Sequence, residues 1–142
     1  MAARSKAAPA TASANPHRGE HQLSLGGRSY LLRPTFSAQV AIEEKTGQSL
    51  IHLIRAGNAG GMPLNVAGTI AAELIRAGAE PGDTITQNVS ADRIAEMIFE
   101  EGQPVAVAKL TLCMVDMATG GRKASGEAKA VAPKTTDETT AA

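Results

Sequence analysis

Histidine and cysteine are scarce in this chain of 142 residues, which has three histidines and one cysteine. His17 and His21 are four residues apart, but proline interrupts their segment and no third ligand accompanies them. Two solvent-exposed imidazoles are therefore favoured over a metal site, and His52 is expected on the polar side of a short helix. Cys113 has only Lys109 as a basic neighbour at helical spacing, so we expect a buried, inert thiol.

The acidic and glycine-rich motifs do not predict catalysis either. The pairs Glu43-Glu44 and Glu100-Glu101 would point about 100° apart on a helix, so neither pair can share one ion or one proton. The segment 57–61 is glycine-rich but lacks the Lys-Ser/Thr that completes a phosphate-binding loop. We therefore expect no catalytic residue, no metal and no cofactor, and hence a protein that is not an enzyme.

Overall composition narrows the possible partners. Lys+Arg and Asp+Glu each number 14, so the formal charge is zero, without the basic excess that supports nucleic-acid binding. No stretch approaches the roughly 18–20 consecutive apolar residues that a membrane-spanning helix needs. Aromatic residues make up 2% of the chain, so any core must consist of Leu, Ile, Val, Met and Ala.

Two shifts in composition divide the chain into three parts. Residues 1–14 contain no Leu, Ile, Val or aromatic residue. Residues 122–142 contain a single residue of these types, Val131. Neither segment can bury enough apolar surface to offset the entropy of ordering, so both are predicted to be disordered. Residues 15–121 are predicted to form one domain.

The domain is expected to be mainly α with a small N-terminal antiparallel β-hairpin. Strands 22–25 and 29–33 flank Gly26-Gly27, a pair suited to a two-residue turn. Five helices in a compact bundle follow, and residues 57–61 are expected to be a flexible connector. Helical spacing, caps and breakers place these helices from Thr35 or Pro34 to Thr46, at 50–55, from Pro63 to Gly78, at 91–101 and at 105–118.

The last predicted helix is apolar on nearly its whole circumference. Only Lys109, Thr111 and Asp116 interrupt it, so it lies either at the centre of the core or under a partner. Methionine is flexible and suits surfaces that accept similar apolar helices. If a partner covers this helix, the predicted contact residues are Met97, Leu110, Met114 and Met117. The alternative interpretation is that the three methionines fill gaps in the core.

Three parts of the sequence together resemble a known family. They are Asn15-Pro16-His17-Arg18-Gly19-Glu20, the run from Gly26 to Thr35, and Ala38 through Glu43-Glu44 to Gly47. The chain resembles the small tail proteins of gene transfer agents and related siphophages, which are classed as tail assembly chaperones and have also been labelled tail tube proteins. The similarity is strongest over residues 15–50 and looser to about residue 118. The Ala/Thr-rich tails and the glycine-rich connector depart from the family pattern.

This resemblance implies a non-enzymatic chaperone in the bacterial cytoplasm. Such a protein coats the long helical tape measure protein and leaves as tail tube protein polymerises around it. Its partners would be those two proteins and possible further copies of itself, with no cofactor, nucleic acid or membrane. The role needs an adaptable apolar face that binds helices through weak, repeated contacts.

Two alternatives remain open at this stage. The chain could be a structural tail component, a tube or connector subunit of a gene transfer agent or prophage particle. A tube subunit would need a largely β fold, which the predicted helices do not favour. A small DNA-binding regulator would need a basic recognition helix, and none of the five predicted helices exceeds about one net positive charge.

Overall fold

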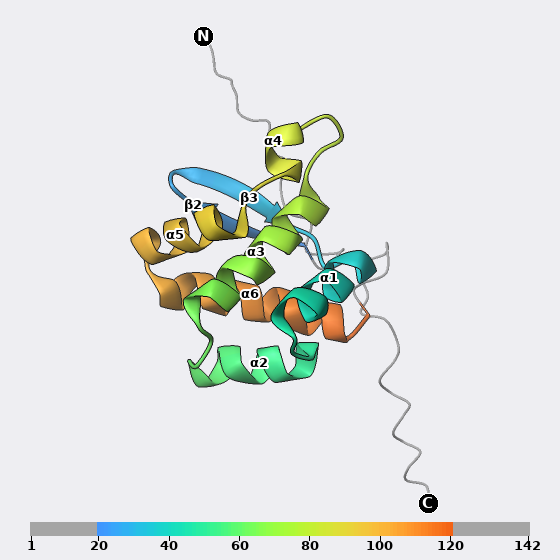
Figure 1. Cartoon of the computed structure of the whole chain (residues 1–142), viewed down its shortest axis with the longest axis vertical. Coiled ribbons are helices and arrows are strands. Elements are labelled where there is room, and N and C mark those ends of the chain that lie inside the picture. The colour runs from blue at the N-terminus through green and yellow to red at the C-terminus, as the bar shows by residue number, and fades with distance from the viewer. Residues whose placement is uncertain (1–19, 121–142) are drawn as a thin grey trace, which may run out of the picture.

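The computed structural model describes residues 20–120 and confirms a mainly helical fold with a two-stranded hairpin at the N-terminal side (Figure 1). The predictions of disorder for residues 1–14 and 122–142 lie outside the described residues. Within residues 20–120 there are six helices and two strands. In chain order these are β2 (His21–Leu25), β3 (Arg28–Leu32), α1 (Phe36–Thr46), α2 (Leu50–Ala59), α3 (Leu64–Gly78), α4 (Thr84–Gln87), α5 (Ala91–Glu101) and α6 (Gln103–Ala118).

The hairpin turns at the predicted glycine pair. Gly26 and Gly27 both have positive φ, +58° and +78°, as a two-residue hairpin turn requires. The strands are antiparallel, with Leu25 opposite Arg28 and Leu23 opposite Tyr30. Leu23, Leu25, Tyr30 and Leu32 are buried, so one face of the hairpin covers the helices. This packing supplies the stability that an isolated hairpin lacks.

Helix α3 lies at the centre of the molecule and packs against α1, α5, α6 and β3. The apolar face predicted from its spacing is confirmed, because its five members are almost fully inaccessible to solvent: Ala67, Ile70, Ala71, Leu74 and Ile75. In Figure 1, α3 crosses in front of α6, with α5 and α1 beside it. The other buried apolar residues join α3 in one contiguous core.

Polar side chains cap the N-termini of helices α1 and α5. Thr35 Oγ1 accepts a hydrogen bond from the Ala38 N–H at the start of α1, and Ser90 caps α5 in the same way. Helix α5 has the bounds that the sequence predicted. Helix α6 starts at Gln103, two residues before the start predicted at residue 105, because Gly102 ends α5 and directly precedes it.

The predictions of a short second helix and a flexible connector at 57–61 are wrong. Helix α2 continues through Gly57 to Ala59 and ends at Gly60, whose φ is +77°. Gly57 is helical because α2 packs there on α6: a Cβ on Gly57 would stand 2.1 Å from Thr111 Oγ1. The glycine thus permits a close contact between helices rather than a break. Helix α4, a single turn capped by Asp83, was not predicted.

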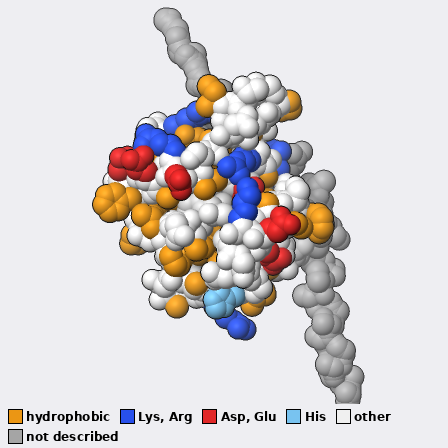
Figure 2. Space-filling model, in the orientation of Figure 1, with side chains coloured by type: hydrophobic (Ala, Val, Ile, Leu, Met, Phe, Trp, Pro, Cys, Tyr) orange, Lys and Arg blue, Asp and Glu red, His pale blue; other side chains and the backbone are white. Residues whose placement is uncertain are grey.

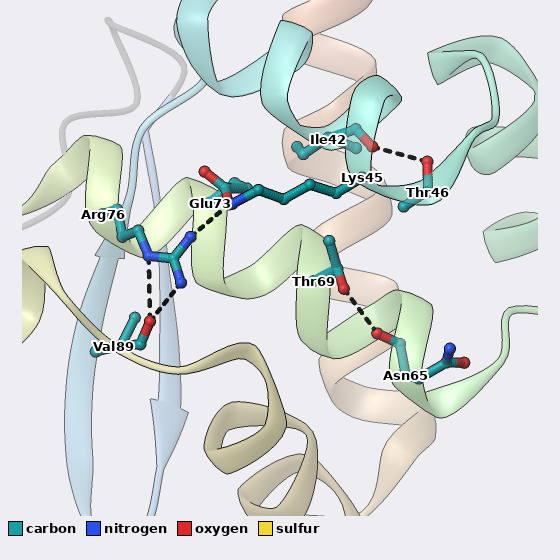
Figure 3. A network of polar contacts seen from close by, with 8 residues as sticks. All are labelled: Ile42, Lys45, Thr46, Asn65, Thr69, Glu73, Arg76 and Val89. Atoms are coloured by element: carbon teal, nitrogen blue, oxygen red, sulfur yellow. Dashed lines mark hydrogen bonds and ion pairs between the residues drawn. The ribbon is translucent and has the colours of Figure 1, made fainter.

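One buried carboxylate links three segments around α3 (Figure 3). Glu73 Oε2 accepts from Lys45 Nζ of α1 at 2.6 Å and also pairs with Arg76. Arg76 Nε donates to the backbone oxygen of Val89, just before α5, at 3.1 Å. The interaction network fixes α1 and the start of α5 against the central helix, and it compensates the burial of Glu73.

Candidate partner-binding surface

Helix α6 has two apolar faces, and only one of them lies in the core. The inward face contains seven buried residues: Ala106, Val107, Leu110, Thr111, Cys113, Met114 and Met117. Thr111 is accommodated there because its hydroxyl donates to the backbone oxygen of Val107 at 2.7 Å. The helix therefore contributes a complete core face, and its remaining apolar residues lie outside the core.

The outward face carries a row of apolar side chains, which we call the α6 stripe: Val105, Ala108, Leu112 and Val115. Their exposed fractions are 70% for Val105, 56% for Leu112 and 40% for Val115, and Ala108 is also exposed. The spacing of three, four and three residues is that of the a and d positions of a heptad. Such a row presents one continuous seam along the helix, suited to contact with another helix.

A groove lies on each side of the first turns of α6. On the α2 side, a groove of about 500 Å³ is lined by the end of α2, Met62 and the first turns of α6, including Pro104 and Ala108. The other groove, of about 310 Å³, lies between β2 and the start of α6 and includes Val105. The N-terminal half of the stripe, at Val105 and Ala108, therefore has a hollow on either side, into which longer side chains of a partner can enter.

The four predicted partner contacts are on the wrong side of their helices for this role. Met97, Leu110, Met114 and Met117 have exposed fractions of 8%, 0%, 0% and 6%, so the structure places all four in the core. Met97 packs beneath the hairpin turn, with its Sδ 3.4 Å from the position of a Cβ on Gly26. The alternative interpretation, that the methionines fill the core, describes their observed positions.

The sequence held a signal for the exposed row, namely the heptad spacing 105, 108, 112 and 115. That signal was ambiguous because the opposite face of α6 is equally apolar. The polar residues do not separate the faces either, since Thr111 is buried while Lys109 is exposed. Only the packing of α2, α3 and β2 against α6 shows which face is left open.

Charges lie on the β2 side of the α6 stripe. Asp116 Oδ2 is 2.8 Å from Nε2 of His21, which lies in β2 and is partly buried. The prediction of a solvent-exposed imidazole at His21 is therefore wrong, because β2 lays this residue against α6; His17 lies outside the described residues. His52 is exposed, as predicted. The groove on the α2 side, by contrast, has no charged residue in its lining among residues 20–120.

The remaining reactive side chains are buried in the core or hydrogen-bonded between elements. Burial, and secondarily the charge of Asp116, raises the pKa of the Cys113 thiol to about 12, which confirms the buried, inert thiol. Glu43 Oε2 accepts from the backbone N–H of Leu50 at 2.8 Å, and Glu101 Oε2 from that of Gly26 at 3.0 Å. These two carboxylates therefore join neighbouring elements.

Charged side chains of both signs cross the middle of the face around α3, with hydrophobic ones singly or in small groups between them (Figure 2). In the part of the chain that the structure describes, no three His, Cys, Asp or Glu residues are grouped to hold a metal ion. Likewise, no helix within residues 20–120 has both the length and the apolar character to cross a membrane.

Comparison of the chain with protein-family models, with curated proteins and with solved structures finds no match. The two features that bear on function are the surface of α6 and the sequence resemblance described above.

Proposed function

We propose that this chain is a non-enzymatic tail assembly chaperone that binds the tape measure protein during tail assembly in the bacterial cytoplasm. The observation that supports the proposal is the α6 stripe, a solvent-exposed row of apolar side chains at heptad spacing on a helix whose other face already fills the core. A tape measure protein is expected to be a long helical chain with apolar faces that must be kept from aggregating.

The geometry suits a helix as the occupant of this surface. An amphipathic helix lying along α6 would set its apolar residues between Val105, Ala108, Leu112 and Val115 and place longer side chains in the two flanking grooves. One such seam is short, so each contact would be weak and reversible. Many copies along one client would still cover it, and they could leave as tube subunits replace them.

The chain itself has little with which to cover the α6 stripe. Residues 1–19 and 121–142 contain Met1 and Val131 as their only large aliphatic residues and have no aromatic residue. Burying the stripe under either segment would therefore remove little apolar surface from water. A helix from another molecule is the better source of matching apolar surface.

The proposal is tested by co-expression with the tape measure protein of the same tail gene cluster. The wild-type chain should increase the soluble fraction of the tape measure protein. The double variant Leu112→Glu/Val115→Glu should lose this effect, because two carboxylates in the seam must be desolvated when a helix docks. Both positions are on the surface, so the fold should persist.

A matched control is Ile85→Glu, on α4, where the side chain is 76% exposed and lies outside the α6 stripe. This variant should protect the tape measure protein as well as the wild type does. Equal aggregation of the tape measure protein with and without the wild-type chain would refute the chaperone proposal. Loss of protection in Ile85→Glu alone would refute the assignment to α6.

A further inference from the structure

The two grooves beside the first turns of α6 differ in charge. Among residues 20–120, the lining of the groove on the α2 side, of about 500 Å³, includes no charged residue. The groove on the β2 side, of about 310 Å³, includes Glu101 and Lys109. A helix docked on the α6 stripe therefore meets a different environment along each of its two flanks.

The α2-side groove suits a long apolar side chain. Two of its lining residues, Met62 and Val107, are buried apolar residues. The side-chain amide of Gln103 already donates to the backbone oxygen of Met62 at 3.4 Å. A carboxylate or ammonium group that enters here loses water without gaining an ion-pair partner from the lining, which costs free energy. This groove therefore favours an uncharged flank of the client.

Lys109 is the available cation of the β2-side groove. Its side chain is exposed, and within residues 20–120 it makes no hydrogen bond or ion pair. The carboxylate of Glu101 is instead held at the hairpin turn, where it accepts from the Gly26 N–H at 3.0 Å. An acidic side chain of a client can therefore pair with Lys109 and stabilise the complex modestly at its solvent-exposed margin.

Asp116 limits how many acidic residues this flank of a client can carry. It follows Lys109 by seven residues, so the two side chains lie on the same side of α6. Its Oδ2 atom is 2.8 Å from Nε2 of His21 in β2. A client carboxylate opposite Asp116 would be repelled by it. The matching flank therefore has one acidic residue opposite Lys109 and neutral residues further along.

We propose that the α6 stripe binds a client helix in one direction, by selecting a helix with one acidic residue on one flank and uncharged apolar residues on the other. Turning a docked helix end to end keeps its apolar face on α6 but exchanges its two flanks. Such a helix places its acid beside Lys109 and its apolar flank beside α2 in only one direction. The inference rests on the proposed function, and it gives copies bound to similar segments of one client the same direction.

The heptad positions of α6 give the expected direction for a designed peptide. With Val105 at position a, Lys109 is at position e, on the β2 side. Pro104 is at position g, on the α2 side. In an antiparallel pair of helices e faces e and g faces g, whereas in a parallel pair e faces g. A peptide with one glutamate at e and methionine at g should therefore bind antiparallel to α6, and a peptide with these flanks exchanged should bind parallel.

Methyl NMR of the full chain tests the direction, with each peptide carrying a nitroxide spin label at its N-terminus. Val105 and Val115 are about 15 Å apart along α6, and a nitroxide broadens near signals far more than distant ones. The peptide with glutamate at e should broaden the Val115 methyl signals and spare those of Val105, and the exchanged peptide should do the reverse. Broadening of the same end by both peptides, or of both ends equally by each, would overturn the inference and leave helix binding to the stripe intact.

Removal of the charge at position 109 tests the residue that sets the direction. Lys109→Gln should weaken the binding of both peptides about two- to fivefold, the effect of losing one exposed ion pair. Arg93→Gln removes an exposed cation from α5, outside both grooves, and should leave binding unchanged. Equal affinities of the wild type and both variants would overturn the role of Lys109. Absence of any chemical-shift change at the α6 stripe with either peptide would overturn the inference together with the helix-binding surface on which the proposed function depends.

Discussion

At the scale of single residues, Cys113 shows how burial changes the pKa of a thiol. Desolvation on the inward face of α6 raises the pKa of its thiol to about 12, against 9.0 for an exposed cysteine. The folded thiol therefore stays protonated where the unfolded one ionises. As a result this residue contributes stability below about pH 9, and that contribution declines as the pH rises above it.

This environment predicts very slow alkylation of the native protein. At pH 8 the thiolate fraction of folded Cys113 is roughly a thousandfold smaller than that of the unfolded chain, and burial also restricts access. Iodoacetamide labelling followed by mass spectrometry should show almost no modification in native buffer and complete modification in denaturant. Rapid labelling of the native chain would mean that this face of α6 opens to solvent.

The residues that the sequence predicted correctly are those whose role is local. Ser90 caps a helix, and Gly26 and Gly27 adopt the positive φ values of a tight turn, for reasons that depend only on their neighbours in the chain. Met97 and Met114 illustrate the opposite case, since methionine suits both a core and an adaptable surface. Only the three-dimensional packing assigns them to the core.

At the scale of elements, α3 and α5 approach each other closely at a glycine. A Cβ on Gly68 would stand 2.6 Å from the Ala95 Cβ and 2.8 Å from the backbone oxygen of Ala91. The approach is limited by backbone as well as side-chain atoms of α5, so adding a methyl group must move one helix.

Gly68→Ala should therefore destabilise the protein by about 1–3 kcal/mol, although alanine is the better helix former. The free energy of unfolding from urea titration provides the measurement. Gly61→Ala, the same chemical change at a position with nothing within 4 Å, should alter stability by less than about 1 kcal/mol. Similar stability of both variants and the wild type would show that α3 and α5 can separate at little cost.

Helices α2 and α4 show where local patterns mislead. Gly57 looks like a helix terminator in the sequence, yet it continues α2 because Thr111 of α6 leaves no room for a side chain. Helix α4 is one turn held by Asp83, too short to produce a periodic apolar pattern. The path of α2 thus depends on a contact between segments that are distant in sequence. Helix α4 was missed because it is too short to show a period.

At the scale of the whole molecule, the mainly α architecture with one hairpin could be predicted because long periodic helices and strong caps dominate residues 34–118. The candidate surface could be predicted only in part. Excess apolar character on the last helix was evident, but its two apolar faces have similar composition. Which face remains open depends on how α2, α3 and β2 surround α6.

The most direct test of the central claim is methyl NMR of the full chain titrated with a helical segment of the tape measure protein. If α6 binds the client, chemical-shift changes should be concentrated at the exposed methyl groups of Val105, Leu112 and Val115. The methyl group of Ile85, on the separate α4 turn, should remain unchanged and provides the internal reference. Absence of any change at the α6 stripe, or changes confined to Ile85, would contradict the account.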